Sequence, residues 1–384
     1  MTERNVNNKK LALTGGAAAA EALKQIEPEV MPIYPITPQT PIIETYAKFQ
    51  ADGLVDTEII KVESEHSALS AAIGSSAAGA RTVTATSSQG LALMHEMLYI
   101  ASGMRLPILM VISARALSAP INIHGDHSDV MGARDAGWIQ IFCENAQEVY
   151  DKTILGIKLA EKVKLPVMVI MDGFNTSHSV ENLEILETEI IKKFIGEYKA
   201  ETSLLNVENP MTYGPVALQN SYFEFRIDQE KAMNEAIEEY KRIAKDYAKI
   251  SGRNYDYFEE YKTKDAEKVM ILAGSAAGTA KVAVDKLRSQ NEKAGLLKIN
   301  LFRPFPRKEI AVALKNAKEV IVLDRAQSIG TNPPFYAEIV NSLYQMPDTK
   351  YKIRSFVYGL GGRDIFQKQI EDVFSGKHKE KYIK

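Results

Sequence analysis

The chain of 384 residues is poor in cysteine and nearly neutral in net charge. Its single cysteine, Cys143, excludes an internal disulfide and any zinc site or iron–sulfur cluster held by cysteines of this chain alone. Lys and Arg number 47 against 49 Asp and Glu, so no excess of positive charge indicates a nucleic-acid or anionic membrane surface. No apolar run approaches the roughly 18 residues that a membrane span requires.

The N-terminal segment differs from a signal peptide. Lys9 and Lys10 precede a short apolar stretch, but Thr14-Gly15-Gly16 interrupts it and Glu21 stands where the cleavage region would fall. We therefore expect a strand end or turn at the glycines, an Ala-rich helix after them, and a cytoplasmic protein.

The rest of the composition is that of a globular protein with two or three domains, with 45% hydrophobic and 25% charged residues. Between residues 31 and 172, short β-rich runs alternate with helical stretches. We expect strands at 31–34, 58–62, 81–86, 107–113 and 165–171, and helices at 38–50, 65–79, 89–102 and 145–163. Several strand runs are continuously apolar, which is typical of strands covered by helices on both faces. The pattern predicts an α/β fold with a doubly wound parallel sheet.

Three regions are expected along the chain. Residues 1–180 form the first α/β domain, and residues 181–265 form a connector or arm with an amphipathic helix within 229–250. Residues 266–384 form a smaller second α/β domain. Its strands are expected at 269–273, 296–300 and 319–324, and its helices at 279–290 and 307–315.

Two segments with chemical potential follow the first two strands. Tyr34-Pro35-Ile36-Thr37-Pro38 contains two prolines that stop the strand and hold Thr37 at the carboxyl edge of the sheet, where α/β proteins bind ligands. A plain turn would have the same residues. Glu65, in Glu63-Ser64-Glu65-His66-Ser67, stands in the first turn of a helix, where the dipole favours a carboxylate with or without a ligand.

Two further segments follow the next strands. Ser88 and Gln89 belong to the polar cluster Thr86–Gly90, whose hydroxyls and free N–H groups suit a polar or anionic ligand, although an N-cap would also explain them. Arg115 closes a hydrophobic strand. A buried guanidinium needs an anionic partner, which is either the carboxylate of a substrate or a nearby aspartate.

The run His124-Gly125-Asp126-His127-Ser128-Asp129 permits two interpretations, a metal site or a hydrogen-bonding wall of a polar pocket. Phosphate-binding motifs are absent from the sequence: it has no Walker loop and no Gly-x-Gly-x-x-Gly after a strand. We expect Gly359–Gly362 to be a turn.

Taken in order, these segments resemble the α subunit of the 2-oxoacid:ferredoxin oxidoreductases, most closely the pyruvate:ferredoxin oxidoreductases. The resemblance is strong over about residues 12–200 and looser in the C-terminal domain. The matching segments are 34–38, 64–67, 86–91, 114–117, 125–129, 134–138 and 172–174.

The resemblance implies an enzyme that uses thiamine diphosphate for the oxidative decarboxylation of pyruvate to acetyl-CoA and CO2, or for the reverse reaction. It gives this chain the pyrimidine-binding half of the cofactor site, followed by a transketolase C-terminal-like domain without a catalytic residue. A partner β subunit is expected to hold the diphosphate and its Mg²⁺. Partner subunits of the γ and δ type are expected to carry [4Fe-4S] clusters that pass electrons to ferredoxin, and coenzyme A takes the acyl group.

The resemblance also implies roles for individual residues. Glu65 is expected to hydrogen-bond N1′ of the aminopyrimidine, which favours the tautomer able to take the proton from C2 of the thiazolium. Thr37 and Arg115 are expected to contact the 2-oxo acid. The other expected cofactor-binding residues are Pro35, Ser88 and Gln89, the other expected substrate-binding residues are Asp126 and His127, and no metal ligand is expected in this chain.

Three alternatives remain at this point. The same chemistry could act on a branched-chain or another 2-oxo acid. The chain could be a non-redox thiamine-dependent component of the transketolase or dehydrogenase type, or a non-catalytic α/β scaffold whose only role is assembly.

Overall fold

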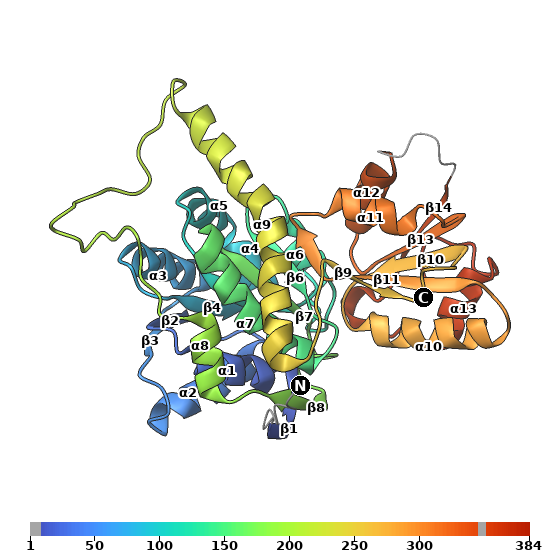
Figure 1. Ribbon diagram of the computed structural model, residues 1–384, viewed down its shortest axis with the longest axis horizontal. Helices are drawn as coiled ribbons and strands as arrows, with labels where there is room; N and C mark the ends of the chain where they lie inside the picture. Colours follow the sequence, from blue (N-terminus) through green and yellow to red (C-terminus); the bar gives the residue numbers. More distant parts are fainter. Residues whose placement is uncertain (1–8, 345–350) are drawn as a thin grey trace.

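A central, mostly parallel sheet organises the first half of the computed structural model, which describes residues 9–344 and 351–384 (Figure 1). Its strand order is β12-β6-β7-β5-β4, and a parallel bridge from Val30 to Thr82 places the parallel pair β2-β3 beside β4. Only β12 runs antiparallel to its neighbour within this arrangement. The strands are β2 (Val30–Ile33), β3 (Glu58–Lys61), β4 (Val83–Thr86), β5 (Leu109–Ala114), β6 (Ile139–Phe142), β7 (Val167–Asp172) and β12 (Leu301–Arg303).

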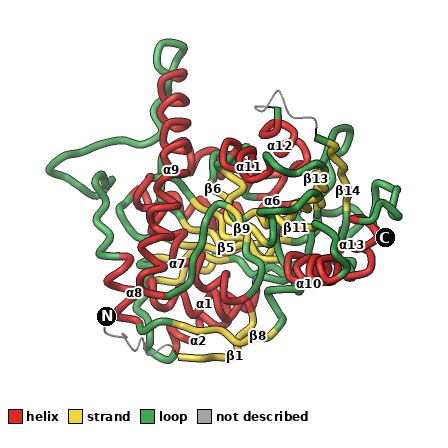
Figure 2. Tube along the Cα trace, turned by 45° about the vertical axis from the view of Figure 1, so that its right-hand side comes forward, coloured by secondary structure: helices red, strands yellow, loops and turns green. Residues whose placement is uncertain are grey.

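Helices cover both faces of this sheet, as Figure 2 shows for α1, α7 and α9 on one side. Within β5, Leu109 and Val111 join one hydrophobic cluster, while Met110 and Ile112 join the cluster on the other face. Both faces of the strand are therefore dry, which confirms the interpretation of its uninterrupted apolar run. One face packs against α1 (Gly15–Ile26), α2 (Thr40–Ala51) and α7 (Ala146–Val163), and the other against α3 (Glu65–Ala77), α4 (Ser88–Leu93), α5 (His95–Gly103) and α6 (Ser128–Gly132).

Two sequence expectations for this region were wrong. The single helix expected at 89–102 is divided at Met94, whose ψ of −3° lies outside the α-helical range, into α4 and α5. No glycine or proline marks this division, so the local sequence carries no signal for it. Strand β6 was not expected at all, because it has only four residues and its place beside β7 depends on long-range pairing.

The central sheet and the helices that cover it form the first unit of the structure. The segment that leads from this sheet to the second one packs around the first unit. Strand β8 (Val180–Ile185) pairs antiparallel with β1 (Lys9–Thr14), and α8 (Thr188–Ile195) packs near α1. Helix α9 (Tyr222–Ser251) begins earlier than the sequence pattern suggested, and its buried Ala236, Tyr240 and Tyr247 pack in the core beside α7. Its N-terminal end projects with the loop 196–221 (Figure 1). Within the described residues, no helix has both the length and the apolar character of a membrane span.

A second sheet, of order β14-β13-β10-β11-β9, forms the C-terminal unit. Only the edge strand β9 is antiparallel to its neighbour, and it comes from the region expected to be a connector. The strands are β9 (Phe258–Tyr261), β10 (Lys268–Leu272), β11 (Ala294–Ile299), β13 (Glu319–Asp324) and β14 (Lys352–Val357). The helices are α10 (Ala276–Ser289), α11 (Arg307–Leu314), α12 (Pro334–Leu343) and α13 (Gln367–Phe374), with a 3-10 turn η1 (Leu360–Gly362). Because β12 follows β11 directly and pairs with β6, the two units share backbone hydrogen bonds.

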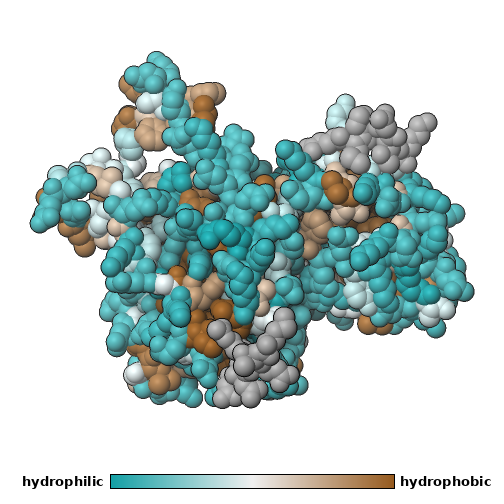
Figure 3. Space-filling view, in the orientation of Figure 1, coloured by the Kyte–Doolittle hydropathy of each residue, from teal (hydrophilic) through white to brown (hydrophobic). Residues whose placement is uncertain are grey.

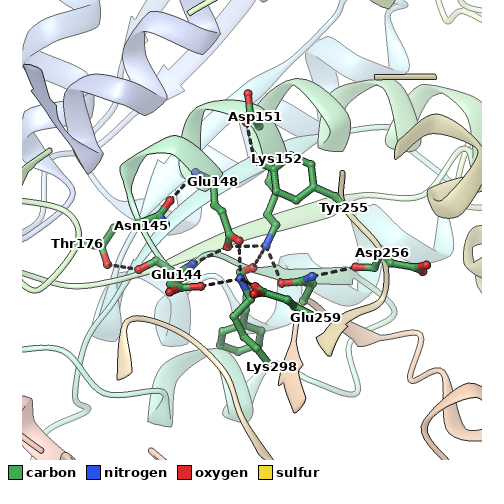
Figure 4. Close-up of polar contacts among 12 residues, drawn as sticks. Glu144, Asn145, Glu148, Asp151, Lys152, Thr176, Tyr255, Asp256, Glu259 and Lys298 are labelled. Atoms are coloured by element: carbon green, nitrogen blue, oxygen red, sulfur yellow. Dashed lines mark hydrogen bonds and ion pairs between the residues drawn. The ribbon is translucent and has the colours of Figure 1, made fainter. Parts of the chain in front are cut away.

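A buried ion network ties α7 to the second sheet (Figure 4). The Glu148 carboxylate accepts hydrogen bonds from Lys152 Nζ at 2.7 Å and from Lys298 Nζ at 2.5 Å. Lys298, which is 2% exposed, also lies 2.7 Å from Glu144 and 2.8 Å from Glu259. The three carboxylates lie close enough together to resemble a metal cage. The lysine ammonium groups supply the positive charge that a cation would bring, so the cluster is a structural ion network.

Candidate active site

The expected site residues gather at the carboxyl edge of the first sheet. Thr37 follows β2, Glu65 follows β3, Ser88 follows β4 and Arg115 follows β5. Because these strands are parallel, their carboxyl ends meet at one edge, which is where open α/β sheets bind ligands. The prediction that Thr37 lies at this edge is confirmed.

Glu65 is a buried carboxylate at the start of α3. The side chain of Ser64 accepts a hydrogen bond from the Ser67 N–H at 3.2 Å and so fixes the helix start. Glu65 is 7% exposed, yet in residues 9–344 and 351–384 no hydrogen-bond donor or cation pairs with its carboxylate. The α4 backbone lies against it: a Cβ at Gly90 would stand 2.8 Å from Glu65 Oε1. Neither carboxylate oxygen of Glu65 is among the fully buried atoms that lack a partner, so both oxygens reach the surface of the site, where a ligand that supplies an N–H group can bond to them.

Arg115 is the complementary case, a buried guanidinium without a counter-charge. Its Nε donates to the main-chain oxygen of Asn122 and its Nη1 donates to that of Thr37, both at 2.9 Å. Arg115 is 6% exposed, and no carboxylate of the described chain pairs with its guanidinium. Of the two partners that the sequence allowed for the guanidinium, an aspartate is therefore not the one found within the described residues. The Thr37 side chain is exposed beside it.

Asp129, which the sequence analysis considered only as part of the run 124–129, accepts hydrogen bonds from two backbone segments of the site. Its Oδ2 accepts hydrogen bonds from the backbone N–H of Ser88 at 2.8 Å and of Arg115 at 3.0 Å. Ser88 has a φ of +49°, a left-handed conformation that is uncommon outside glycine and is held here by Asp129 and by a 2.6 Å bond from Ser88 Oγ to Ala116 O. Burial raises the pKa of Asp129 to about 7, although the backbone N–H donors act in the opposite direction.

The remaining expected residues divide into two groups. Pro35 is exposed at the sheet edge, and half-buried Gln89 has its Oε1 2.7 Å from Ser88 Oγ. Asp126 and His127, in contrast, are buried and bonded to other residues of the chain, although His127 Nδ1 has no partner among the described residues. Asp126 accepts from Ser128 N and from Gly361 N at 2.9 and 3.0 Å, and His127 Nε2 lies 2.6 Å from Asp172.

Asp172 and Arg325 form a buried ion pair between the two units, which sequence reasoning also missed. Arg325 Nη1 lies 2.7 Å from Asp172 Oδ2. Burial acts to raise the pKa of Asp172, but the charges of Arg325 and His127 outweigh it and hold the pKa below its usual range. The only available signal was the occurrence of both residues directly at strand ends.

Comparison with known proteins defines the class first. Residues 21–245 match the family described as pyruvate flavodoxin/ferredoxin oxidoreductase, thiamine diphosphate-binding, so the first unit has a thiamine-diphosphate-binding fold. Residues 266–370 match core domain II of pyruvate:ferredoxin oxidoreductase. The chain belongs to the pyruvate:ferredoxin oxidoreductase family.

The relatives cover almost the whole chain. Pyruvate synthase subunit PorA of Thermotoga maritima is 51% identical over 96% of this chain and 95% of its own length. Ketoisovalerate oxidoreductase subunit VorA of Pyrococcus abyssi is 42% identical over 93% of this chain and 90% of its own. A solved 2-oxoglutarate:ferredoxin oxidoreductase from Magnetococcus marinus shares the fold, with a TM-score of 0.75 and 20% identity over 96% of this chain. The match spans 65% of that longer chain.

Proposed function

We propose that this chain is the α subunit of a pyruvate:ferredoxin oxidoreductase and that it provides the pyrimidine side of a thiamine-diphosphate site. The complex would convert pyruvate and coenzyme A to acetyl-CoA and CO2, or catalyse the reverse reaction. One observation carries the proposal: among the described residues, the Glu65 carboxylate has no hydrogen-bond donor and the Arg115 guanidinium has no carboxylate partner, and both groups lie at the same sheet edge. A ligand pair consisting of a protonated ring nitrogen and a carboxylate would satisfy both groups.

Glu65 fits the aminopyrimidine of thiamine diphosphate. The carboxylate lacks a donor in the described chain and lies against the α4 backbone at Gly90, so a ring N–H can complete its hydrogen bonding. When bound, the cofactor supplies a nucleophilic carbon that attacks the keto group. We propose that Glu65 holds a proton at the ring nitrogen and that Pro35, Ser88 and Gln89 lie beside the same ring.

Arg115 and Thr37 fit the substrate. The Nε and Nη1 atoms of Arg115 are bound to main-chain oxygens, which leaves Nη2 to meet a carboxylate. A guanidinium held in this way fixes the orientation of the 2-oxo acid as well as neutralising its charge. Thr37 is an exposed residue whose main-chain oxygen accepts from Arg115 Nη1, and we propose that its side chain also contacts the substrate.

The chain would act with partner subunits. Burial raises the pKa of its one cysteine, Cys143, to about 12, so the [4Fe-4S] clusters that lead to ferredoxin belong on partners. We propose that a β subunit brings the diphosphate and Mg²⁺, and that γ- and δ-type subunits complete a cytoplasmic complex. The loop 196–221 and the N-terminal end of α9 offer a surface for a partner subunit. Their apolar side chains are between 69% and 92% exposed at Leu205, Val207, Val216 and Phe223. Figure 3 shows hydrophobic surface at the projecting end of α9.

A branched-chain 2-oxo acid is the second candidate substrate, because the P. abyssi VorA subunit is 42% identical to this chain. The deciding experiment is an assay of the purified complex with pyruvate, 2-ketoisovalerate or 2-oxoglutarate, together with coenzyme A and a viologen dye. We expect dye reduction that depends on thiamine diphosphate and is fastest with pyruvate. A higher kcat/KM with 2-ketoisovalerate would transfer the assignment to the branched-chain substrate. Turnover without dye reduction would instead indicate a non-redox thiamine enzyme.

A further inference from the structure

The carboxyl edge of the second sheet holds a side chain from the first unit. Asp172, the last residue of β7, is 1% exposed, and its Oδ2 accepts hydrogen bonds from Ser275 N at 2.8 Å and from Ser275 Oγ at 2.6 Å. Arg325 Nη1 donates to the same oxygen at 2.7 Å. The start of α10 at Ser275 and the guanidinium of Arg325 together form an arrangement that binds anions. The anion bound here is the carboxylate of Asp172.

The same contacts secure the segment 122–127 of the first unit. Asp172 Oδ1 lies 2.6 Å from His127 Nε2, and His127 N donates to the main-chain oxygen of Arg325 at 2.9 Å. The turn at Gly361 adds two bonds: its N–H donates to Asp126 Oδ2 at 3.0 Å, and its carbonyl accepts from Asn122 Nδ2 at 3.1 Å. The second unit therefore holds both ends of this segment.

Segment 122–127 in turn sets the direction of Arg115. The main-chain oxygen of Asn122 accepts from Arg115 Nε, and the oxygen of Thr37 accepts from Nη1. The side chain of Asn122, which is bound to Gly361, keeps the first of these acceptors in place. A continuous set of hydrogen bonds thus runs from the second unit to the guanidinium.

We propose that the second unit positions Arg115 for its substrate, with Arg325 and Gly361 as positioning residues that act through the segment 122–127. The proposal rests on the proposed function of Arg115. It gives Asp126 and His127 a supporting role behind the site in place of direct substrate contact. Positioning matters because a displacement of about 1 Å at a reacting group can cost on the order of 100-fold in rate.

The test uses the purified complex carrying Asn122→Ala, which removes the side-chain bonds to Gly361 and to His124 N without burying a charge. We expect the KM for pyruvate to rise about 10-fold, with an unchanged apparent affinity for thiamine diphosphate. Arg325→Gln should raise KM at least as much, and Arg325→Lys should restore part of the loss because an ammonium still faces Asp172. Hydrogen exchange should be faster in residues 118–128 of the Asn122→Ala complex.

Lys281→Gln is the matched control. Lys281 also joins the two units, through Glu144 at 2.8 Å, but it does not contact the segment 122–127. Its KM for pyruvate should equal that of the unmodified complex. The proposal would be overturned if the Asn122 and Arg325 variants both kept the KM for pyruvate and the hydrogen-exchange rates of the unmodified complex. It would also be overturned if Lys281→Gln raised the KM for pyruvate as much as those variants do. If the unmodified complex turns over no 2-oxo acid, the proposed function fails, and the exchange measurement still tests the positioning contacts.

Discussion

The guanidinium of Arg115 donates a hydrogen bond to the main-chain oxygen of Thr37 across 2.9 Å. This bond joins the residue after β5 to the turn after β2. We propose that the two residues form one half-site for a 2-oxo acid, because the bond keeps exposed Thr37 next to the guanidinium.

Arg115→Lys tests this half-site. Lysine keeps the charge but cannot bind two backbone oxygens and a carboxylate in one plane. We expect KM for pyruvate to rise about 10- to 100-fold, which corresponds to roughly 1.5–3 kcal/mol for a hydrogen bond to a charged group. Steady-state kinetics of the complex with a viologen dye measure this change. An unchanged KM would show that the substrate carboxylate binds elsewhere.

Glu65→Gln tests the cofactor half of the site. Glutamine has the same shape but cannot hold a proton at a ring nitrogen in the way a carboxylate does. We expect the rate of decarboxylation to fall about 100-fold or more, while thiamine diphosphate still binds. Exposed Glu63→Gln, two residues earlier, is the control and should retain full activity. Equal activity of both variants would support a non-catalytic scaffold.

Gly90→Ala should displace Glu65 without altering its chemistry. The added Cβ would lie 2.4 Å from Thr86 Oγ1 and 2.8 Å from Glu65 Oε1, so these side chains must move. We expect weaker binding of thiamine diphosphate and a loss of activity about as large as that of Glu65→Gln. In Gly74→Ala, on the same helix as Glu65, the new methyl group would meet nothing within 4 Å. That control should bind the cofactor normally; a matching defect there would show that helix α3 tolerates no change.

The Glu148 network should contribute acid-sensitive stability. Burial acts to raise the pKa of Glu148, but Lys152 and Lys298 outweigh it and lower the pKa to about 2. Because the folded-state pKa lies below the unfolded value, the stabilisation is complete above about pH 4.5 and is lost as the pH falls from there towards 2.

Glu148→Gln should therefore destabilise the protein at pH 7 by about 3–5 kcal/mol, since it leaves buried lysines without their full counter-charge. The difference from the unmodified complex should shrink below pH 4.5. Thermal unfolding of the complex at several pH values between 7 and 3 measures both effects. Glu96→Gln, whose side chain is 77% exposed, serves as the control. A difference that stays constant with pH would show that Glu148 is not ionised in the folded protein.

Much of the fold and part of the candidate site follow from local sequence. The alternation of apolar runs and helical stretches predicted the parallel sheet, because a strand with two dry faces needs apolar side chains throughout. Since parallel strands place their carboxyl ends at one edge, that pattern also predicted the neighbourhood of Thr37, Glu65 and Arg115. The roles of these side chains toward ligands came from family resemblance and stay predictions.

The tertiary structure alone decided what surrounds those residues. Asp172 and Arg325 stand 153 positions apart, and their ion pair leaves no periodicity in the sequence. The same holds for β6 and β12, whose pairing depends on chain segments that meet only after folding. Helix and strand propensities depend on a few neighbouring residues. A buried charge, in contrast, is stable only where folding brings an oppositely charged group next to it, and that group can be distant in the sequence. The sequence by itself therefore determined the sheet and the placement of candidate residues at its edge. The folded structure determined which of the described charges are paired and which have no charged partner.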